Sequence, residues 1–84
     1  MYTFNIMQAL DLGCNFWDTS DIYGLGHNEQ LISKVLATRR DEVFLCTKFA
    51  FVVENGKRSI RGDAAYVKTA CDASLKRLGI STIE

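Results

Sequence analysis

Hydrophobic and polar positions alternate along the chain in blocks that predict helices and strands in turn. In residues 4–12 the apolar side chains of Ile6 and Leu10 recur at helical spacing and share one face. Thr3 is expected to cap this helix, and Gly13 stands where a left-handed helix stop is favoured. A helix therefore opens the predicted fold.

Two short apolar runs predict strands. Residues 14–19 are short, aromatic and follow a helix stop, and they end in Asp18-Thr19. Residues 43–47 are almost continuously apolar, which is typical of a central parallel strand covered on both faces. Thr82-Ile83 is expected to open a further strand.

Two more helices separate these strands. Asn28 is expected to cap the helix over residues 29–37, with Glu29 in the first turn, where a carboxylate suits the helix dipole. Asp63 is expected to cap a longer helix that ends at Gly79. The apolar stripe of the first of these helices consists of Leu31, Ile32, Val35 and Leu36.

The alternation of helices and strands predicts an α/β fold with a parallel sheet and right-handed crossovers, in a single domain over residues 1–84. Two architectures have this order: a doubly wound open sheet and a slice of an eight-fold βα barrel. Residues 53–63 are polar and are expected to form a mobile loop.

Composition narrows the function classes. Hydrophobic residues make up 48% of the 84 positions and charged residues 24%, which is typical of a globular domain. Ten basic and ten acidic residues cancel, so we expect a small-molecule partner and neither a nucleic acid nor a membrane surface. The start of the chain lacks the features of a signal peptide, and no apolar run reaches the roughly 18 residues of a membrane helix. The expected location is the cytoplasm.

The three cysteines fall in apolar segments at wide spacing. Cys14, Cys46 and Cys71 support neither a disulfide framework nor a zinc site. We expect all of them to be buried free thiols.

Candidate chemistry lies at the ends of the two predicted strands. Asp18 and Lys48 lie at the carboxyl ends of neighbouring parallel strands, which is where both architectures place their functional residues. Neighbouring strands are close enough for the two side chains to meet, so we expect them to form an ion pair. Tyr23 follows on the loop after Asp18. An ammonium close to a phenol favours the phenolate and lowers the pKa of the phenol, which would let Tyr23 give its proton to a carbonyl as a hydride reaches the carbon.

Structural roles remain open for the same residues. A strand-end Asp can cap a turn, a Lys can extend into solvent, and a loop Tyr can pack its ring. Asp21 is a weaker alternative to Asp18 because it lies beyond the strand end. The only histidine, His27, is expected to be an exposed loop residue, without metal-ligand spacing.

The glycines Gly24 and Gly26 follow a strand and precede a helix. A dinucleotide-binding fingerprint would need a third glycine where Glu29 stands, so a Rossmann site is disfavoured.

Short blocks along the whole chain resemble the aldo-keto reductase family. They are Ala9-Leu10-Asp11-Leu12-Gly13, Phe16-Trp17-Asp18-Thr19, Tyr23-Gly24, Asn28-Glu29, Thr47-Lys48-Phe49 and Ser74-Leu75-Lys76-Arg77-Leu78-Gly79. The family pattern differs mildly at Ser20 and Ala50, where alanine and glycine are common.

The resemblance implies a partial (β/α)8 TIM barrel and an NADP-dependent oxidoreductase that reduces aldehydes or ketones with NADPH. It implies that Tyr23 is the general acid, that Lys48 lowers the pKa of the tyrosine, and that Asp18 holds the lysine and contacts the nicotinamide ribose. The family's catalytic histidine would lie shortly beyond Ile83-Glu84, so we expect an N-terminal fragment of a reductase.

The isolated chain is therefore expected to be inactive, doubtful in cofactor binding and marginally stable. One alternative is a non-catalytic interaction or regulatory module of the same family, in which a partner covers Leu31, Val35, Val67 and Leu75. A second alternative is a small open-sheet nucleotide binder.

Overall fold

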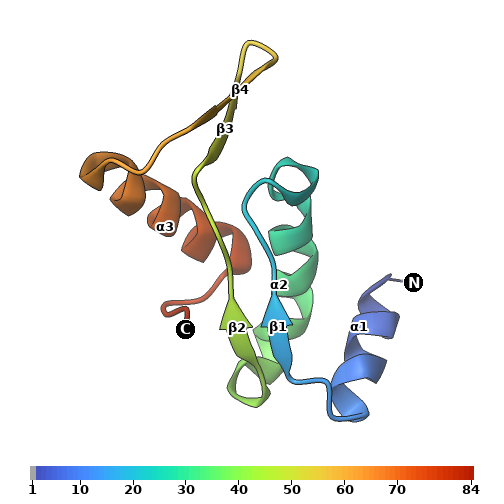
Figure 1. The fold of residues 1–84 in the computed structure, drawn as a ribbon. Coiled ribbons are helices and arrows are strands. Elements are labelled where there is room, and N and C mark those ends of the chain that lie inside the picture. The colour runs from blue at the N-terminus through green and yellow to red at the C-terminus, as the bar shows by residue number, and fades with distance from the viewer. Residues whose placement is uncertain (1) are drawn as a thin grey trace.

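Residues 2–84, the part of the chain that this computed structural model describes, fold as three helices, a two-stranded parallel sheet and a projecting hairpin (Figure 1). The predicted alternation of helices and strands is confirmed through the second strand. In chain order the elements are α1 (Tyr2–Asp11), β1 (Phe16–Asp18), a 3₁₀ turn (Tyr23–Gly26), α2 (His27–Arg39), a second 3₁₀ turn (Arg40–Glu42), β2 (Phe44–Cys46), β3 (Phe51–Glu54), β4 (Lys57–Ile60) and α3 (Ala64–Leu78).

The parallel pair β1–β2 is covered on one face only. Trp17 pairs with Leu45 in the ladder, and Leu45 is fully buried in the core beneath the helices. Side chains alternate along a strand, so Phe16 and Phe44 lie on the opposite face, where their rings stack at 5.0 Å and remain exposed. The prediction that residues 43–47 are covered on both faces is therefore wrong.

The core forms where the helices meet the covered face of β2. Its buried side chains come from α1, α2, β2, the residue before β2, and the end of α3, which ties the distant segments of the chain into one cluster. Burial of apolar surface is the main force that holds these elements together. The cluster consists of Leu10, Ile32, Val35, Leu36, Val43, Leu45 and Leu78. Because Val35 is fully buried here, it cannot belong to a surface that a partner covers.

The end of the chain lies beside the free edge of β2, although no strand is described at Thr82-Ile83. The backbone N–H of Glu84 donates to the carbonyl of Leu45 at 3.1 Å. The N–H of Leu45 donates to a carboxylate oxygen of Glu84 at 3.0 Å. The Glu84 side chain thus takes the place that a backbone carbonyl would have in a further strand.

Three of the predicted helix ends are confirmed and two are wrong. Gly13 follows the end of α1 with a φ value of 97°, the left-handed stop that the sequence predicts. The side chain of Asp63 accepts a hydrogen bond from the N–H of Tyr66, and Gly79 ends α3 with a left-handed backbone. Thr3 lies inside α1 rather than before it. Asn28 lies inside α2, because the 3₁₀ turn continues directly into this helix through Gly26.

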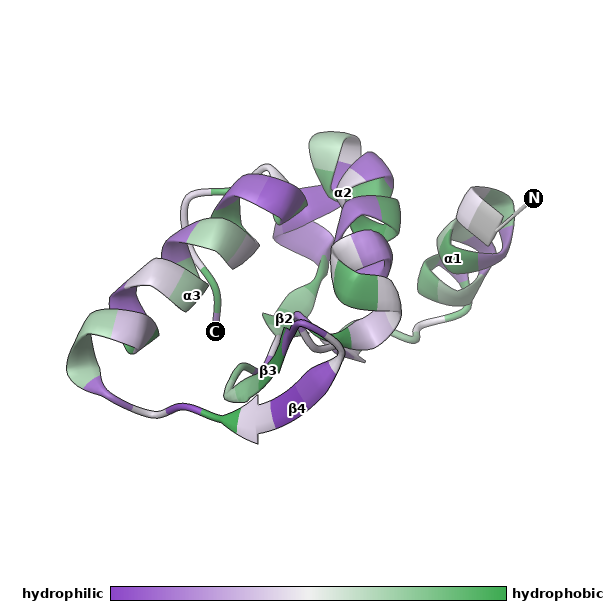
Figure 2. Cartoon of the chain, turned by 90° about the horizontal axis from the view of Figure 1, so that it is seen from above, coloured by the Kyte–Doolittle hydropathy of each residue, from purple (hydrophilic) through white to green (hydrophobic). Residues whose placement is uncertain are grey.

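The segment predicted as a mobile loop is a β-hairpin. β3 and β4 pair antiparallel from Phe51 with Ile60 to Glu54 with Lys57. Asn55 and Gly56 connect them with φ values of 51° and 75°, and Asn-Gly is a strong signal for such a tight turn. The basic residues at the start of β4 make this part of the strand hydrophilic (Figure 2).

Candidate active site

Asp18 and Lys48 meet at the carboxyl end of the parallel strands. Asp18 is the last residue of β1, and Lys48 follows the end of β2. The Lys48 ammonium Nζ lies 2.7 Å from the Asp18 Oδ1 atom and also donates to the carbonyl of Thr19 at 2.8 Å. Asp18 and Lys48 therefore form the ion pair that their positions at the two strand ends predict.

Tyr23 lies beside this pair at the start of the first 3₁₀ turn. The Lys48 ammonium is 5.6 Å from the centroid of the Tyr23 ring, within reach of a cation–π contact. Among residues 2–84 the Tyr23 hydroxyl has no hydrogen-bond partner, and the side chain is half-exposed. The phenol is thus close to a cation and free to contact a small molecule.

The ion pair keeps the lysine charged. The hydrogen bond to Asp18 raises the pKa of Lys48 above its usual value, desolvation opposes this shift, and the charge of Asp18 adds to it. The side chains are 49% and 57% exposed, so water and salt screen the pair strongly. The pair therefore places a positive charge next to Tyr23 and contributes little to stability.

The loop after β1 is fastened to the end of β2. The N–H of Asp21 donates to the carbonyl of Lys48 at 3.0 Å, and the N–H of Thr19 donates to the carbonyl of Cys46 at 2.9 Å. From α2, the Asn28 side-chain amide donates to the Thr19 hydroxyl at 2.6 Å. These bonds hold the backbone on both sides of the ion pair.

Behind the strand ends lies a buried carboxylate, Glu29. Its side chain is fully buried and accepts hydrogen bonds from the Thr47 hydroxyl and from the Arg77 Nε atom, each at 2.7 Å. The sequence predicts Glu29 only as a favourable residue in the first turn of a helix. Its partners come from β2's end and from α3, so spacing along the chain gives no signal for this contact.

Asp21 faces a different environment from Asp18. Its Oδ1 atom is buried without a hydrogen-bond partner among the described residues. Burial raises the pKa of Asp21, the charge of Glu29 adds to this effect, and Arg77 opposes it. Asp21 lines a hollow of about 240 Å³ together with Arg77, away from the Lys48 ammonium.

The glycine-containing turn leads directly into α2. Gly24, Leu25 and Gly26 all have positive φ values and belong to the 3₁₀ turn that starts at Tyr23. His27 is exposed at the start of α2. Within residues 2–84 no group of His, Cys, Asp or Glu side chains could hold a metal ion, and no helix is long and apolar enough to cross a bilayer.

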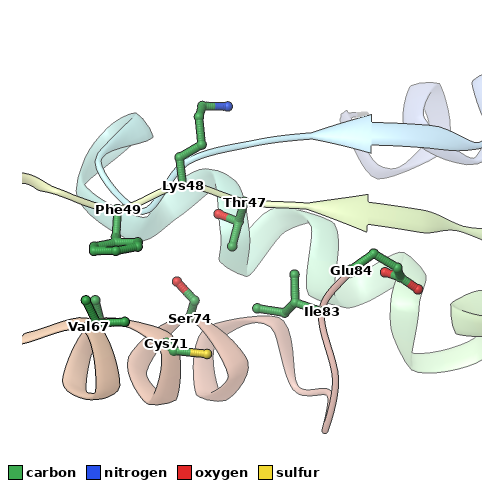
Figure 3. A pocket seen from close by; sticks show the side chains of 9 residues that line it. Thr47, Lys48, Phe49, Val67, Cys71, Ser74, Ile83 and Glu84 are labelled. Atoms are coloured by element: carbon green, nitrogen blue, oxygen red, sulfur yellow. The ribbon is translucent and has the colours of Figure 1, made fainter. Parts of the chain in front are cut away.

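A cavity of about 270 Å³ opens between the free edge of β2 and α3 (Figure 3). Lys48, Phe49, Val67 and Ile83 are among its lining residues, and the ammonium end of Lys48 points away from the other lining side chains. The cavity therefore borders the candidate site at Lys48, while the ammonium points out of it and Tyr23 is not among its lining residues.

The cysteine prediction is partly wrong. All three thiols are free, as expected, but Cys14 and Cys71 are exposed and Cys46 is half-buried. Cys71 lies on α3 and lines the cavity between α3 and the free edge of β2. Cys14 lies in the connection between α1 and β1, outside the core cluster.

A sequence profile of the aldo/keto reductase family matches residues 3–84. A curated relative, "Aldo-keto reductase yakc [NADP(+)]" of Schizosaccharomyces pombe, is 46% identical over 83 residues, which cover 94% of this chain and 24% of the relative.

Solved structures agree with the profile. Aldo-keto reductase AKR11C1 from Bacillus halodurans, in its holo form, matches with a TM-score of 0.85 and 38% identity over 98% of this chain and 28% of its own. The glycerol dehydrogenase AKR11B4 from Gluconobacter oxydans matches with a TM-score of 0.78 and 31% identity over 98% of this chain and 27% of its own. The chain thus spans about a quarter of the length of these relatives, and its α/β order is that of a partial (β/α)8 barrel with short parallel strands.

Proposed function

Because the chain belongs to the aldo/keto reductase family, we propose that Asp18, Tyr23 and Lys48 are the proton-donating part of a site that reduces small aldehydes or ketones to alcohols. The observation that carries the proposal is the 2.7 Å contact between Lys48 and Asp18, with the Lys48 ammonium also beside the Tyr23 ring. The proposed substrates are small carbonyl compounds, and the proposed reaction is their reduction to alcohols.

The residues fit an NADP cofactor in one respect. The Asp18 carboxylate is more than half-exposed, and only its Oδ1 atom has a partner within residues 2–84. The remaining oxygen, Oδ2, can accept a hydrogen bond from a ribose hydroxyl. The curated relative carries NADP(+) in its name, and this supports the same cofactor here. When bound, the reduced nicotinamide supplies a hydride to the carbonyl carbon.

Tyr23 completes the reduction on the oxygen side. Its hydroxyl donates a proton to the carbonyl oxygen, so that hydride and proton together convert the carbonyl to an alcohol. The phenolate that remains is stabilised by the Lys48 ammonium, which Asp18 keeps in place and in its charged form. Because Tyr23 is half-exposed, water can return the proton after each turnover.

The chain spans only part of the length of its relatives, and this limits the activity we expect of it alone. It supplies about a quarter of the length of its relatives. We propose that the isolated chain binds NADPH weakly and turns over little substrate, because few groups besides Asp18 are placed to hold the cofactor.

A graft tests the proposed roles. Residues 3–84 replace the matching segment in the S. pombe relative, and NADPH oxidation with a simple aldehyde is measured. The graft is expected to be active, and Tyr23→Phe is expected to lower kcat by about 10²–10⁴-fold, the usual contribution of a general acid.

Tyr66→Phe is the matched control for this graft. Tyr66 lies on α3, where its ring contacts Arg61 rather than Lys48. Equal loss of activity in the two phenylalanine variants, or full activity of Tyr23→Phe, would show that Tyr23 is not the acid.

A further inference from the structure

We propose that Glu29 is a positioning residue for Lys48, acting through the hydroxyl of Thr47 and fixed in turn by Arg77. The inference rests on the proposed function, because it concerns the group that the site uses to assist Tyr23. It assigns a role to a buried ionic cluster that the candidate site does not itself contain.

Glu29 contacts the end of β2 through Thr47. Thr47 directly precedes Lys48, and their side chains leave the backbone on opposite sides (Figure 3). The Thr47 hydroxyl donates to the Glu29 Oε2 atom at 2.7 Å. A hydrogen bond to a fully buried carboxylate is strong and directional, so it fixes the orientation of the backbone from which Lys48 extends.

Glu29 itself is anchored by Arg77. Its other oxygen, Oε1, accepts from the Arg77 Nε atom at 2.7 Å, while the Arg77 side chain is 26% exposed. Arg77 is packed against Gly26, where an added Cβ would lie 2.8 Å from the Arg77 Cδ atom. The carboxylate is therefore held between α3 and β2's end and has little freedom to move.

The backbone of Lys48 is also held by the loop after β1. The Lys48 carbonyl accepts from the N–H of Asp21 at 3.0 Å, and this bond joins the end of β2 to the loop that carries Tyr23. The strand end is thus held by Glu29 through a side chain and by the loop through the backbone. Loss of the Thr47 hydroxyl should loosen this end of the strand pair and leave the other end intact.

Amide hydrogen exchange of the 84-residue chain tests the proposal at both ends of the ladder. Thr47→Val removes the hydroxyl and keeps the shape of the side chain. It is expected to speed exchange of the Asp21 amide at least about tenfold, which matches the loss of a hydrogen bond to a charged group. The Phe44 amide, which donates to Asn15 at the other end, is expected to change less than about twofold.

Two further variants separate positioning from general stability. Thr47→Ser restores the hydroxyl and is expected to return the exchange of Asp21 to the original rate. Thr69→Val is the matched control, since the Thr69 hydroxyl only donates to Ala65 within α3. This control is expected to leave both amides unchanged.

The Lys48 ammonium gives a second readout by NMR titration. If Thr47→Val releases Lys48 from Asp18, the pKa of Lys48 falls toward its usual value, whereas a uniform loss of stability leaves the folded-state pKa unchanged. Equal acceleration of the Asp21 and Phe44 amides, no acceleration at either, or failure of Thr47→Ser to restore the rate would overturn the positioning role. These measurements need no turnover, so failure of the positioning role is distinguishable from failure of the reductase proposal.

Discussion

The Lys48 ammonium lies 2.7 Å from the Asp18 carboxylate, although 30 positions separate the two residues in sequence. The parallel pairing of β1 with β2 produces this contact, because it sets Asp18 opposite Cys46 and carries Lys48 just past the same edge. The chemistry of the candidate site thus follows from strand pairing.

Asp18→Asn is expected to lower the pKa of Lys48 toward its usual value of 10.5, because the hydrogen bond that Lys48 donates to the Asp18 carboxylate is the main cause of its elevation. A raised lysine pKa stabilises the folded chain below pH 10.5, and this contribution is lost as the pH rises through the raised value. The stability difference between the original chain and the variant is small, because water and salt screen the exposed pair, and it should shrink further at high pH. Titration of the lysine side chains by NMR and melts across this pH range measure both effects, and a pKa of Lys48 that Asp18→Asn leaves unchanged would contradict the ion pair.

Gly26→Ala is expected to destabilise the fold by about 1–3 kcal/mol, the cost of a strained left-handed backbone at a residue other than glycine. Gly26 has a φ value of +98°, and the new Cβ would lie 2.8 Å from the Arg77 Cδ atom. Gly62→Ala is the matched control, because nothing lies within 4 Å of its Cβ position and no left-handed φ is recorded there. Urea denaturation measures both variants, and equal stability of the two would count against both the backbone strain at Gly26 and the packing of Arg77 on it.

Arg77→Met is expected to destabilise the chain by about 3–5 kcal/mol, because it leaves the fully buried Glu29 carboxylate without its cationic partner. The double variant Glu29→Gln, Arg77→Met removes both charges and should recover part of this loss. The same denaturation experiment compares the two. If the double variant were no more stable than Arg77→Met alone, the charge pairing of Glu29 with Arg77 would not explain the loss.

Much of the candidate site can be predicted from the sequence because its residues sit at recognisable strand ends. Asp18 and Lys48 follow apolar runs, and the alternating order of elements requires parallel strands that place their ends at one edge. The helix signals at Asp63 and Gly79 are also local, since each acts within one turn of its helix.

Contacts between distant segments are what the sequence does not provide. Glu29 meets Thr47 and Arg77 across separations of 18 and 48 positions, and no periodic pattern encodes such a meeting. The exposure of Phe44 and Cys71 also depends on which layers cover each face rather than on the residues themselves. The hairpin is a different case, because Asn55-Gly56 carries the local turn signal and the polar composition around it favours a loop instead.

The most direct test of the site is a double-mutant cycle on Tyr23 and Lys48 in the grafted reductase. If Lys48 acts through the phenol, Tyr23→Phe and Lys48→Met each lower kcat, and the double variant falls no further than about threefold below Tyr23→Phe alone, because groups that act as a unit are not additive. Multiplication of the two losses in the double variant would contradict this arrangement and show that Lys48 and Tyr23 contribute independently.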